Sequence, residues 1–253
     1  MLPFFYLPNI RSISLPIGTK DLVRWPTSPP TPSLLTSLRL SRLDHIPTLR
    51  RILSVTTSLE SLRCNFYYQR TTLEAGNRTP PVLDLNLFND ALIPTLRTLV
   101  HLELTCTLSG LGRTMSRGPG PRYPLSVNGS LGRLEDFGEL RTLVIPLVFL
   151  CGLEADTDSE PVLPTLPQKL EEVTITECLS KEGKERWTIY TAIPVLSKWS
   201  SLSKELTPQL RKLCLCFRTS SGAETELANV CAVERIQFDV CDEYLDRELP
   251  SMI

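Results

Sequence analysis

The stretch Leu99-Val100-His101-Leu102-Glu103-Leu104 has leucine at its first, fourth and sixth positions. The same phrase, with leucine or another mostly apolar residue at these positions, recurs along the rest of the chain. Its other first residues are Ile10, Leu35, Leu59, Leu140, Leu170, Leu210 and Val233. A unit that recurs in this way determines the architecture before any single residue is considered.

Each phrase has the period of a β-strand. Alternate side chains of a strand face opposite sides, so the fourth and sixth positions point inward and the third and fifth point outward. The phrase is typical of the strand in a leucine-rich repeat, and one repeat buries too little apolar surface to fold alone. The sequence therefore predicts an α/β fold, a single irregular leucine-rich-repeat solenoid over residues 1–253. It should have a curved parallel sheet with outer helices and loops.

The spacing of the phrases is uneven. Successive phrases begin 25, 24, 40, 41, 30, 40 and 23 residues apart, whereas ordinary repeats span roughly 20 to 29 residues. The three longest intervals therefore require inserted helices or loops. Apolar residues at helical spacing predict helices from Ile46, from Asn89, over 184–205 and over 224–231. Pro194 is expected to kink or divide the third of these.

Two segments lack both periods. Residues 25–33, WPTSPPTPS, are rich in proline, and residues 108–133 are rich in glycine and carry four arginines. Both are predicted to be loops, the second a flexible excursion from the solenoid. Whether either loop has a regulatory role stays open.

The composition argues against several classes of function. The chain has 253 residues, a net charge of -1 and a pI near 6.2, so no positive field for nucleic acid is expected. No apolar run approaches the roughly 20 residues of a membrane span, and the N-terminal segment lacks the pattern of a secretory signal. We therefore predict an intracellular protein, cytoplasmic or nuclear, that binds neither nucleic acid nor membrane.

Eight cysteines raise the question of disulfides and metal sites. Many fall within the apolar pattern, so we expect free, buried thiols in a reducing compartment. Cys214 and Cys216 share the outward face of one strand, but no further ligand stands at zinc-site spacing. Cys178 and Cys241 lie eight residues after the start of their phrases, and their thiols are expected to turn into the core. No metal and no cofactor is predicted.

His101 and Glu103 share an outward strand face and form a candidate acid–base pair. No nucleophile or metal cluster accompanies them at a recognisable spacing. An exposed polar pair is therefore the expected role, and a small hydrolase is the alternative. We predict that the chain is not an enzyme and has no catalytic residues.

The outward strand positions form the main candidate surface. They should line the concave side of the solenoid, the side on which such proteins commonly bind partners. Their mixed charges suit a patterned protein surface. The predicted protein-binding residues are Arg39, Arg63, His101, Glu103, Glu172, Lys212 and Arg235.

Longer motifs extend the pattern along the chain. They are LPNIRSISL (7–15), LTSLRL (35–40), SLESLRC (58–64), LVHLEL (99–104), GSLGRLEDFGELRTLVIPL (129–147) and KWSSLSKELTPQLRKLCL (198–215). With these motifs the chain resembles the repeat region of fungal F-box/leucine-rich-repeat proteins. The resemblance implies repeats that recognise a protein substrate, and an N-terminal F-box that docks to the adaptor of a cullin-type ubiquitin ligase. It implies no catalysis by the chain itself.

The first phrase begins at Ile10, so no F-box is expected before it. Direct binding to the adaptor is therefore not expected, and the chain is interpreted as a recognition module whose partner is unidentified. A truncated or decayed remnant without a specific partner is the alternative. Leu2, Phe4, Phe5 and Leu7 are expected to lie at the open end of the stack, where terminal repeats normally need a cap.

Overall fold

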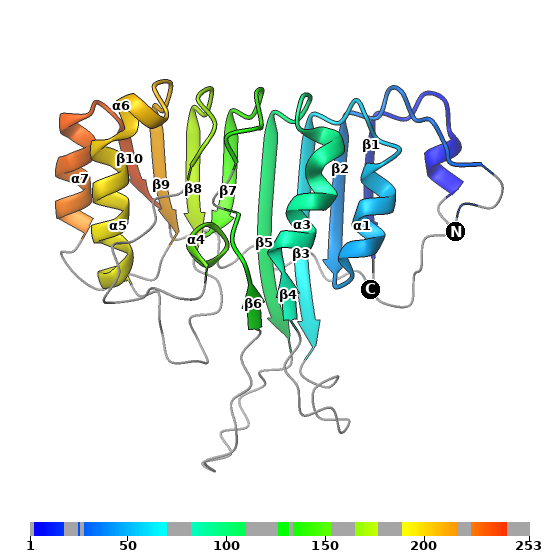
Figure 1. Cartoon of the computed structure of the whole chain (residues 1–253), viewed down its shortest axis with the longest axis horizontal. Helices are drawn as coiled ribbons and strands as arrows, with labels where there is room; N and C mark the ends of the chain where they lie inside the picture. The colour runs from blue at the N-terminus through cyan, green and yellow to red at the C-terminus, as the bar shows by residue number, and fades with distance from the viewer. Residues whose placement is uncertain are drawn as a thin grey trace, which may run out of the picture.

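The main sheet has eight strands that lie side by side in sequence order and are all parallel (Figure 1). The computed structural model describes residues 3–17, 25, 28–69, 82–109, 126–131, 134–152, 165–176, 189–216 and 224–241. The strands are β1 (Ser12–Pro16), β2 (Ser37–Leu43), β3 (Ser61–Gln69), β5 (His101–Ser109), β7 (Thr142–Pro146), β8 (Glu172–Thr176), β9 (Lys212–Cys216) and β10 (Gln237–Val240). The predicted parallel sheet of an α/β protein is confirmed.

The inward positions of the phrases meet in register. Leu38 lies level with Leu62, and Leu62 with Leu102. The complete row of fourth positions is Ile13, Leu38, Leu62, Leu102, Leu143, Val173, Leu213 and Phe238. All but the last are buried, and each such side chain contributes roughly 1.5 to 3 kcal/mol. This row exists only when neighbouring strands are stacked, so the strands stabilise one another.

The starts of β2, β3, β5, β7, β8 and β9 repeat one backbone arrangement. The amides of Val100 and His101 both donate to the carbonyl of Glu60, at 2.8 and 2.9 Å. The same double hydrogen bond to the preceding phrase occurs at Thr36/Ser37, Glu60/Ser61, Arg141/Thr142, Glu171/Glu172 and Arg211/Lys212. Because this arrangement uses only backbone groups, it can form whatever side chains the turn carries.

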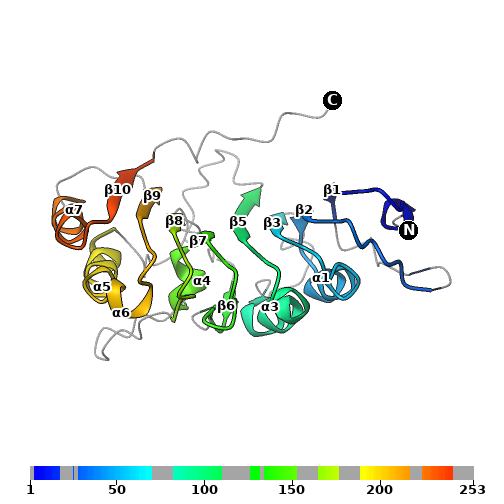
Figure 2. The same ribbon diagram turned by 90° about the horizontal axis from the view of Figure 1, so that it is seen from above.

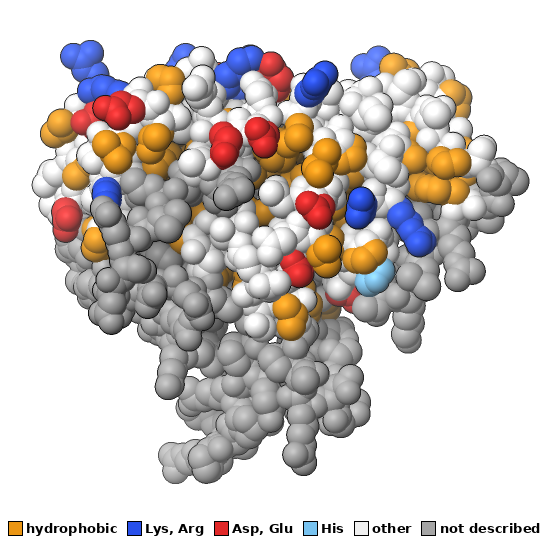
Figure 3. All heavy atoms as spheres, in the orientation of Figure 1, with side chains coloured by type: hydrophobic (Ala, Val, Ile, Leu, Met, Phe, Trp, Pro, Cys, Tyr) orange, Lys and Arg blue, Asp and Glu red, His pale blue; other side chains and the backbone are white. Residues whose placement is uncertain are grey.

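The helices lie along one side of the sheet, and the sheet bows so that the opposite side is concave (Figure 2). They are η1 (Pro3–Tyr6), α1 (Ile46–Leu53), α3 (Leu85–Leu92), η2 (Ile93–Thr95), α4 (Leu147–Cys151), α5 (Ile189–Ser201), α6 (Ser203–Leu206) and α7 (Glu224–Val233). α1 packs against α3, and α5 against α7. Figure 3 shows this helix-bearing side, on which the described acidic and basic side chains are interspersed.

Two of the long intervals between phrases contain an additional strand. β4 (Val82–Asp84) and β6 (Ser126–Asn128) pair in parallel, apart from the main sheet. The Asp84 carboxylate accepts from the Leu87 amide at 3.0 Å and from Asn128 Nδ2 at 3.1 Å. One side chain therefore both caps α3 and joins the two strands.

The prediction of a flexible loop over 108–133 is wrong at both ends of this range. β5 continues to Ser109, and β6 together with the residues up to Leu131 is ordered against β4 and α4. The sequence pattern missed β6 because a three-residue strand is too short to show a period. Residues 110–125 and 132–133 lie outside the described residues.

The helix predicted from Asn89 begins earlier, at Leu85. The Asp84 carboxylate sets this start, because it accepts a hydrogen bond from the Leu87 amide and caps the helix there. Pro194 lies inside α5 and does not divide it. Beyond Pro194, Leu196 and Trp199 are buried and line a small apolar cavity with Val173 of β8. The break comes instead at Leu202, between α5 and α6. The predicted helices from Ile46 and over 224–231 are confirmed.

Aromatic residues close the N-terminal end of the sheet. Phe5 is buried, and its ring meets that of Trp25 edge to face, with ring centroids 5.7 Å apart. Tyr6 also contacts Trp25, and its hydroxyl donates to the Ser28 carbonyl at 2.8 Å. The described residues of the proline-rich segment, 25 and 28–33, contain no helix or strand, as predicted. This segment therefore covers part of the end that the first strand leaves open.

The expected exposure of the N-terminal apolar residues is confirmed only in part. Phe4 and Leu7 are about half exposed, whereas Phe5 is buried, because Trp25 returns over it. Leu2 lies outside the described residues. Phe4 and Leu7 thus lie at the surface of this end.

The last phrase runs two residues later than the sequence pattern predicts. Val233 ends α7 and is exposed, while Gln237 lies level with Lys212. Arg235 stands between them with a φ of 60°, in the left-handed turn that joins helix and strand. Val233, Ile236 and Phe238 fit the phrase spacing, but the first of them belongs to the helix. Arg235 is therefore not on the strand, and the strand's third and fifth positions are Gln237 and Asp239.

Candidate functional site

The register brings the outward side chains into two rows across the concave face. The first row is Ser12, Ser37, Ser61, His101, Thr142, Glu172, Lys212 and Gln237. The second row is Ser14, Arg39, Arg63, Glu103, Val144, Thr174, Cys214 and Asp239. Six of the seven predicted binding residues therefore lie in these rows. The seventh, Arg235, is exposed at the turn before β10, outside the face.

A charged cluster occupies the part of the face formed by β2, β3 and β5. Arg39, Arg63 and Glu103 stand side by side on these strands. Arg63 Nε lies 3.4 Å from Glu103 Oε2, and His101 Nε2 lies 3.6 Å from the same oxygen. Arg39 and Arg63 are exposed, whereas the Glu103 side chain is 19% exposed. The shielded Glu103 carboxylate thus lies close to both Arg63 and His101, and the exposed guanidinium of Arg39 lies on the next strand.

The cluster keeps Glu103 ionised. The His101 ring lowers the pKa of the Glu103 carboxyl, and the charges of Arg63 and Arg39 lower it further, against the opposing effect of burial. The folded pKa is therefore below the usual 4.5. Stability from this carboxylate is fully present above the unfolded value and is lost as pH falls through the folded value.

Replacing Glu103 with glutamine is expected to flatten the acid side of the stability profile. The wild-type chain should lose free energy of unfolding as pH falls below about 4.5, because the unfolded carboxyl takes up its proton first. The variant should lose less over that window and should be less stable at neutral pH. Urea titrations between acid and neutral pH measure both effects. Glu60→Gln, at an exposed glutamate outside the cluster, is the control, and equal acid sensitivity of both variants and wild type would contradict the assignment.

The concave face is not open along its whole length. In the second row, Val144 is 4% and Cys214 8% exposed, and Thr176 and Cys216 further along their strands are also buried. The second row is therefore shielded on β7 and β9. The accessible charged residues of the second row are Arg39 and Arg63 on β2 and β3, and Asp239 on β10.

A second ion pair lies near the other end of the face. Lys212 Nζ is 2.9 Å from Asp239 Oδ2, and the Asp239 carboxylate also accepts from Gln237 Nε2 at 3.1 Å. Lys212 lowers the pKa of Asp239, and Asp239 raises that of Lys212. Exposed Glu172 stands next to Lys212 in register. Asp239 was not among the predicted site residues, because the sequence pattern assigned the fifth position of the last phrase to Gln237, two residues earlier.

Three cysteine thiols meet beyond this ion pair. Cys214 and Cys216 share the outward face of β9, as predicted, and Cys241 follows β10 beside them. The predicted inward turn of the Cys241 thiol is wrong, because the shifted register places Cys241 level with Cys216. The seven described cysteines, which do not include Cys178, form no disulfide. The expectation of free thiols is met for these seven.

The geometry gives the hydrolase alternative no further reactive group. His101 Nε2 faces Glu103, and no hydrogen-bond partner for that nitrogen lies among the described residues. A covalent mechanism would need a hydroxyl or thiol nucleophile within hydrogen-bond reach of this base. The absence of catalysis stays a prediction.

No family model, no curated protein and no solved structure matches the chain. Each helix in the described part of the chain is too short or too polar to traverse a lipid bilayer.

Proposed function

We propose that the chain is a leucine-rich-repeat solenoid that binds a protein partner on its concave face. Three features support the solenoid: phrase-by-phrase parallel strands, the repeated backbone arrangement at their starts, and helices confined to one side. Open concave faces of such arrays commonly bind partners. The observation that carries the binding proposal is the charged cluster of Arg39, Arg63, His101 and Glu103.

The charges of the cluster indicate what the partner presents. Arg39 and Arg63 are adjacent and exposed, and like charges on neighbouring strands repel each other. Glu103 compensates one of them at 3.4 Å. A carboxylate from a partner, placed between the two guanidinium groups, would relieve the repulsion and form charge-assisted hydrogen bonds. The proposed partner therefore docks an acidic side chain at Arg39.

The resemblance to F-box/leucine-rich-repeat proteins adds the partner's class. On this proposal the concave face recognises a protein substrate of a ubiquitin-ligase-like assembly. The serines that flank the cluster in both rows, on β1 to β3, suit this role, because short hydroxyl side chains leave room for a partner while offering hydrogen bonds.

Reversing both exposed arginines tests the proposal. The double variant Arg39→Glu/Arg63→Glu is expected to weaken partner binding by about a hundredfold or more, since two charge-assisted contacts are worth roughly 3 kcal/mol together. Affinity purification with quantitative mass spectrometry identifies the partner with the wild-type chain. Titration of the purified partner then measures the loss.

The matched control is Arg50→Glu/Arg97→Glu, which makes the same change of charge at exposed residues away from the strands. It should bind the partner as wild type does. Equal weakening of partner binding by both double variants would show that only net charge matters. It would contradict binding at the concave face. Failure to enrich any protein with the wild-type chain would favour a remnant without a partner.

A further inference from the structure

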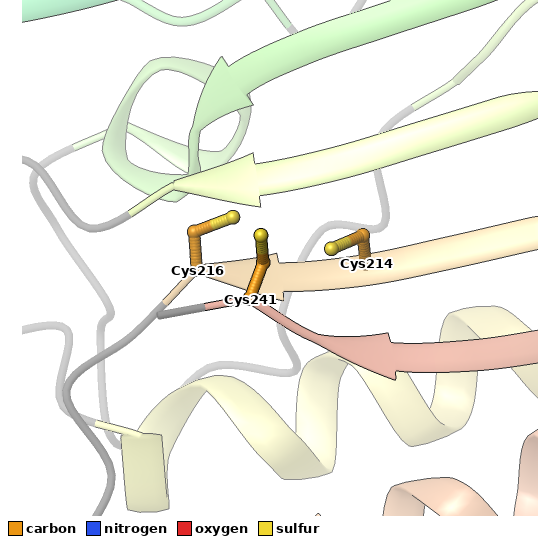
Figure 4. Close-up of side chains that lie close together, drawn as sticks. All are labelled: Cys214, Cys216 and Cys241. Atoms are coloured by element: carbon orange, nitrogen blue, oxygen red, sulfur yellow. The ribbon is translucent and has the colours of Figure 1, made fainter. Parts of the chain in front are cut away.

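Three cysteines from two neighbouring strands converge at one point of the concave side. Cys214 and Cys216 stand two residues apart on β9, and the amide of Cys241 donates to the Leu215 carbonyl at 2.8 Å. The three sulfur atoms all lie within 4.8 Å of one another. Figure 4 shows their side chains turned toward a common centre rather than spread along the strands.

The surroundings of the thiols are shielded from water. Cys216 is 2% and Cys214 8% exposed, and Cys241 is half-buried. Burial raises the pKa of Cys214 and of Cys216, and the neighbouring cysteines add to the effect at Cys216. Ionising the group without a cation would place several negative charges together in a poorly solvated place.

We propose that Cys214, Cys216 and Cys241 bind a thiophilic d10 cation, Cu(I) or Zn(II), through three thiolates. Thiolate ligands select these soft cations over hard ones such as Mg²⁺ and Ca²⁺. Three S–H bonds break, three sulfur–metal bonds form, and three protons pass to solvent. The oxidation state of the metal does not change.

The spacing fits such a centre. A metal–sulfur bond of about 2.3 Å in a trigonal arrangement places the sulfurs about 4.0 Å apart, so the cluster needs to contract by less than about 1 Å. Asp239 stands beside Cys214 in register, but its carboxylate is held by Lys212 at 2.9 Å. Three sulfurs alone suit trigonal Cu(I), and Zn(II) would add a solvent ligand to complete four.

A disulfide is the competing use of these thiols. It joins only two of the three sulfurs and needs an S–S distance of about 2.05 Å. Cation binding engages all three sulfurs in their observed arrangement.

Metal titration of the full reduced chain tests the proposal. Cu(I) is added without oxygen against a chromogenic Cu(I) chelator, and Zn(II) in parallel against a zinc indicator. One equivalent of at least one cation is expected to bind, with release of about three protons at neutral pH, because thiols must deprotonate to ligate. X-ray absorption of the wild-type complex should show three sulfur neighbours for Cu(I), and for Zn(II) three sulfurs with one lighter atom.

Serine variants locate the site. Cys214→Ser, Cys216→Ser and Cys241→Ser should each lose the bound equivalent, whereas Cys106→Ser, at a half-buried thiol on β5, should keep it. The number of sulfur neighbours in the X-ray absorption spectrum of the wild-type complex tests the proposed site even if a variant fails to fold. No bound equivalent, fewer than three sulfur neighbours, or equal binding by a folded triple variant would overturn the proposal. So would a disulfide within the cluster whose reduction yields no cation binding. The outcome is independent of partner capture at Arg39 and Arg63.

Discussion

Replacing Phe66 with alanine is expected to lower the free energy of unfolding by about 3 to 5 kcal/mol, the usual cost of removing a buried phenylalanine. Phe66 is 1% exposed on the inner face of β3. Its ring meets Phe88 of α3 and Phe149 of α4 edge to face, at centroid distances of 5.4 and 5.7 Å. One side chain thus links a strand to two helices from different parts of the chain.

Two companion variants distinguish the stability that the aromatic contacts contribute from the stability that the buried volume contributes. Phe66→Leu should cost much less than Phe66→Ala, because most of the buried volume remains while the edge-to-face contacts are lost. Phe4→Ala, at an exposed aromatic residue, should change stability little. Urea unfolding followed by circular dichroism measures all three. A loss below about 1 kcal/mol in Phe66→Ala would show that Phe66 does not connect these elements.

Trp199 on α5 is the second position at which a large loss is expected. It is 1% exposed and lines a small apolar cavity with Leu147, Leu150 and Val173. Its Nε1 has no hydrogen-bond partner among the described residues. Trp199→Ala should therefore lower the free energy of unfolding by about 3 to 5 kcal/mol through lost packing.

Trp199→Phe distinguishes the packing of the indole from its polar nitrogen. An unpaired buried N–H costs roughly 1 to 3 kcal/mol, and phenylalanine removes it while keeping most of the apolar surface. The phenylalanine variant should consequently be far more stable than the alanine variant and close to wild type. Thermal and urea unfolding compare the three chains. Equal losses in the two variants would mean that the nitrogen contributes a hydrogen bond.

Much of the sheet followed from the sequence because its information is local. A phrase with apolar residues at its first, fourth and sixth positions specifies a strand and its inward face. Seven of the eight phrases were placed in the correct register. The eighth was misplaced because Val233 is apolar and correctly spaced, yet it completes the last turn of α7. β4 and β6 were missed because strands of three residues depend on their partner rather than on a period.

In the candidate sites, too, the sequence predicted the features that are local to one strand. Alternation along one strand was enough to place His101 with Glu103, and Cys214 with Cys216. Their partners on neighbouring strands were not all predictable. Arg63 reaches Glu103, and Cys241 reaches Cys216, only through the register between strands, and in the second case through the turn at Arg235.

The repeated Leu-x-x-Leu-x-Leu phrase by itself determined a parallel α/β array and the face to which most of its side chains point, because alternation along a strand is a property of the local backbone. Only the tertiary structure decided which outward side chains meet, how much of the concave face is accessible, and where the last strand begins. These depend on register, turn geometry and burial, which arise when segments far apart in the chain pack together.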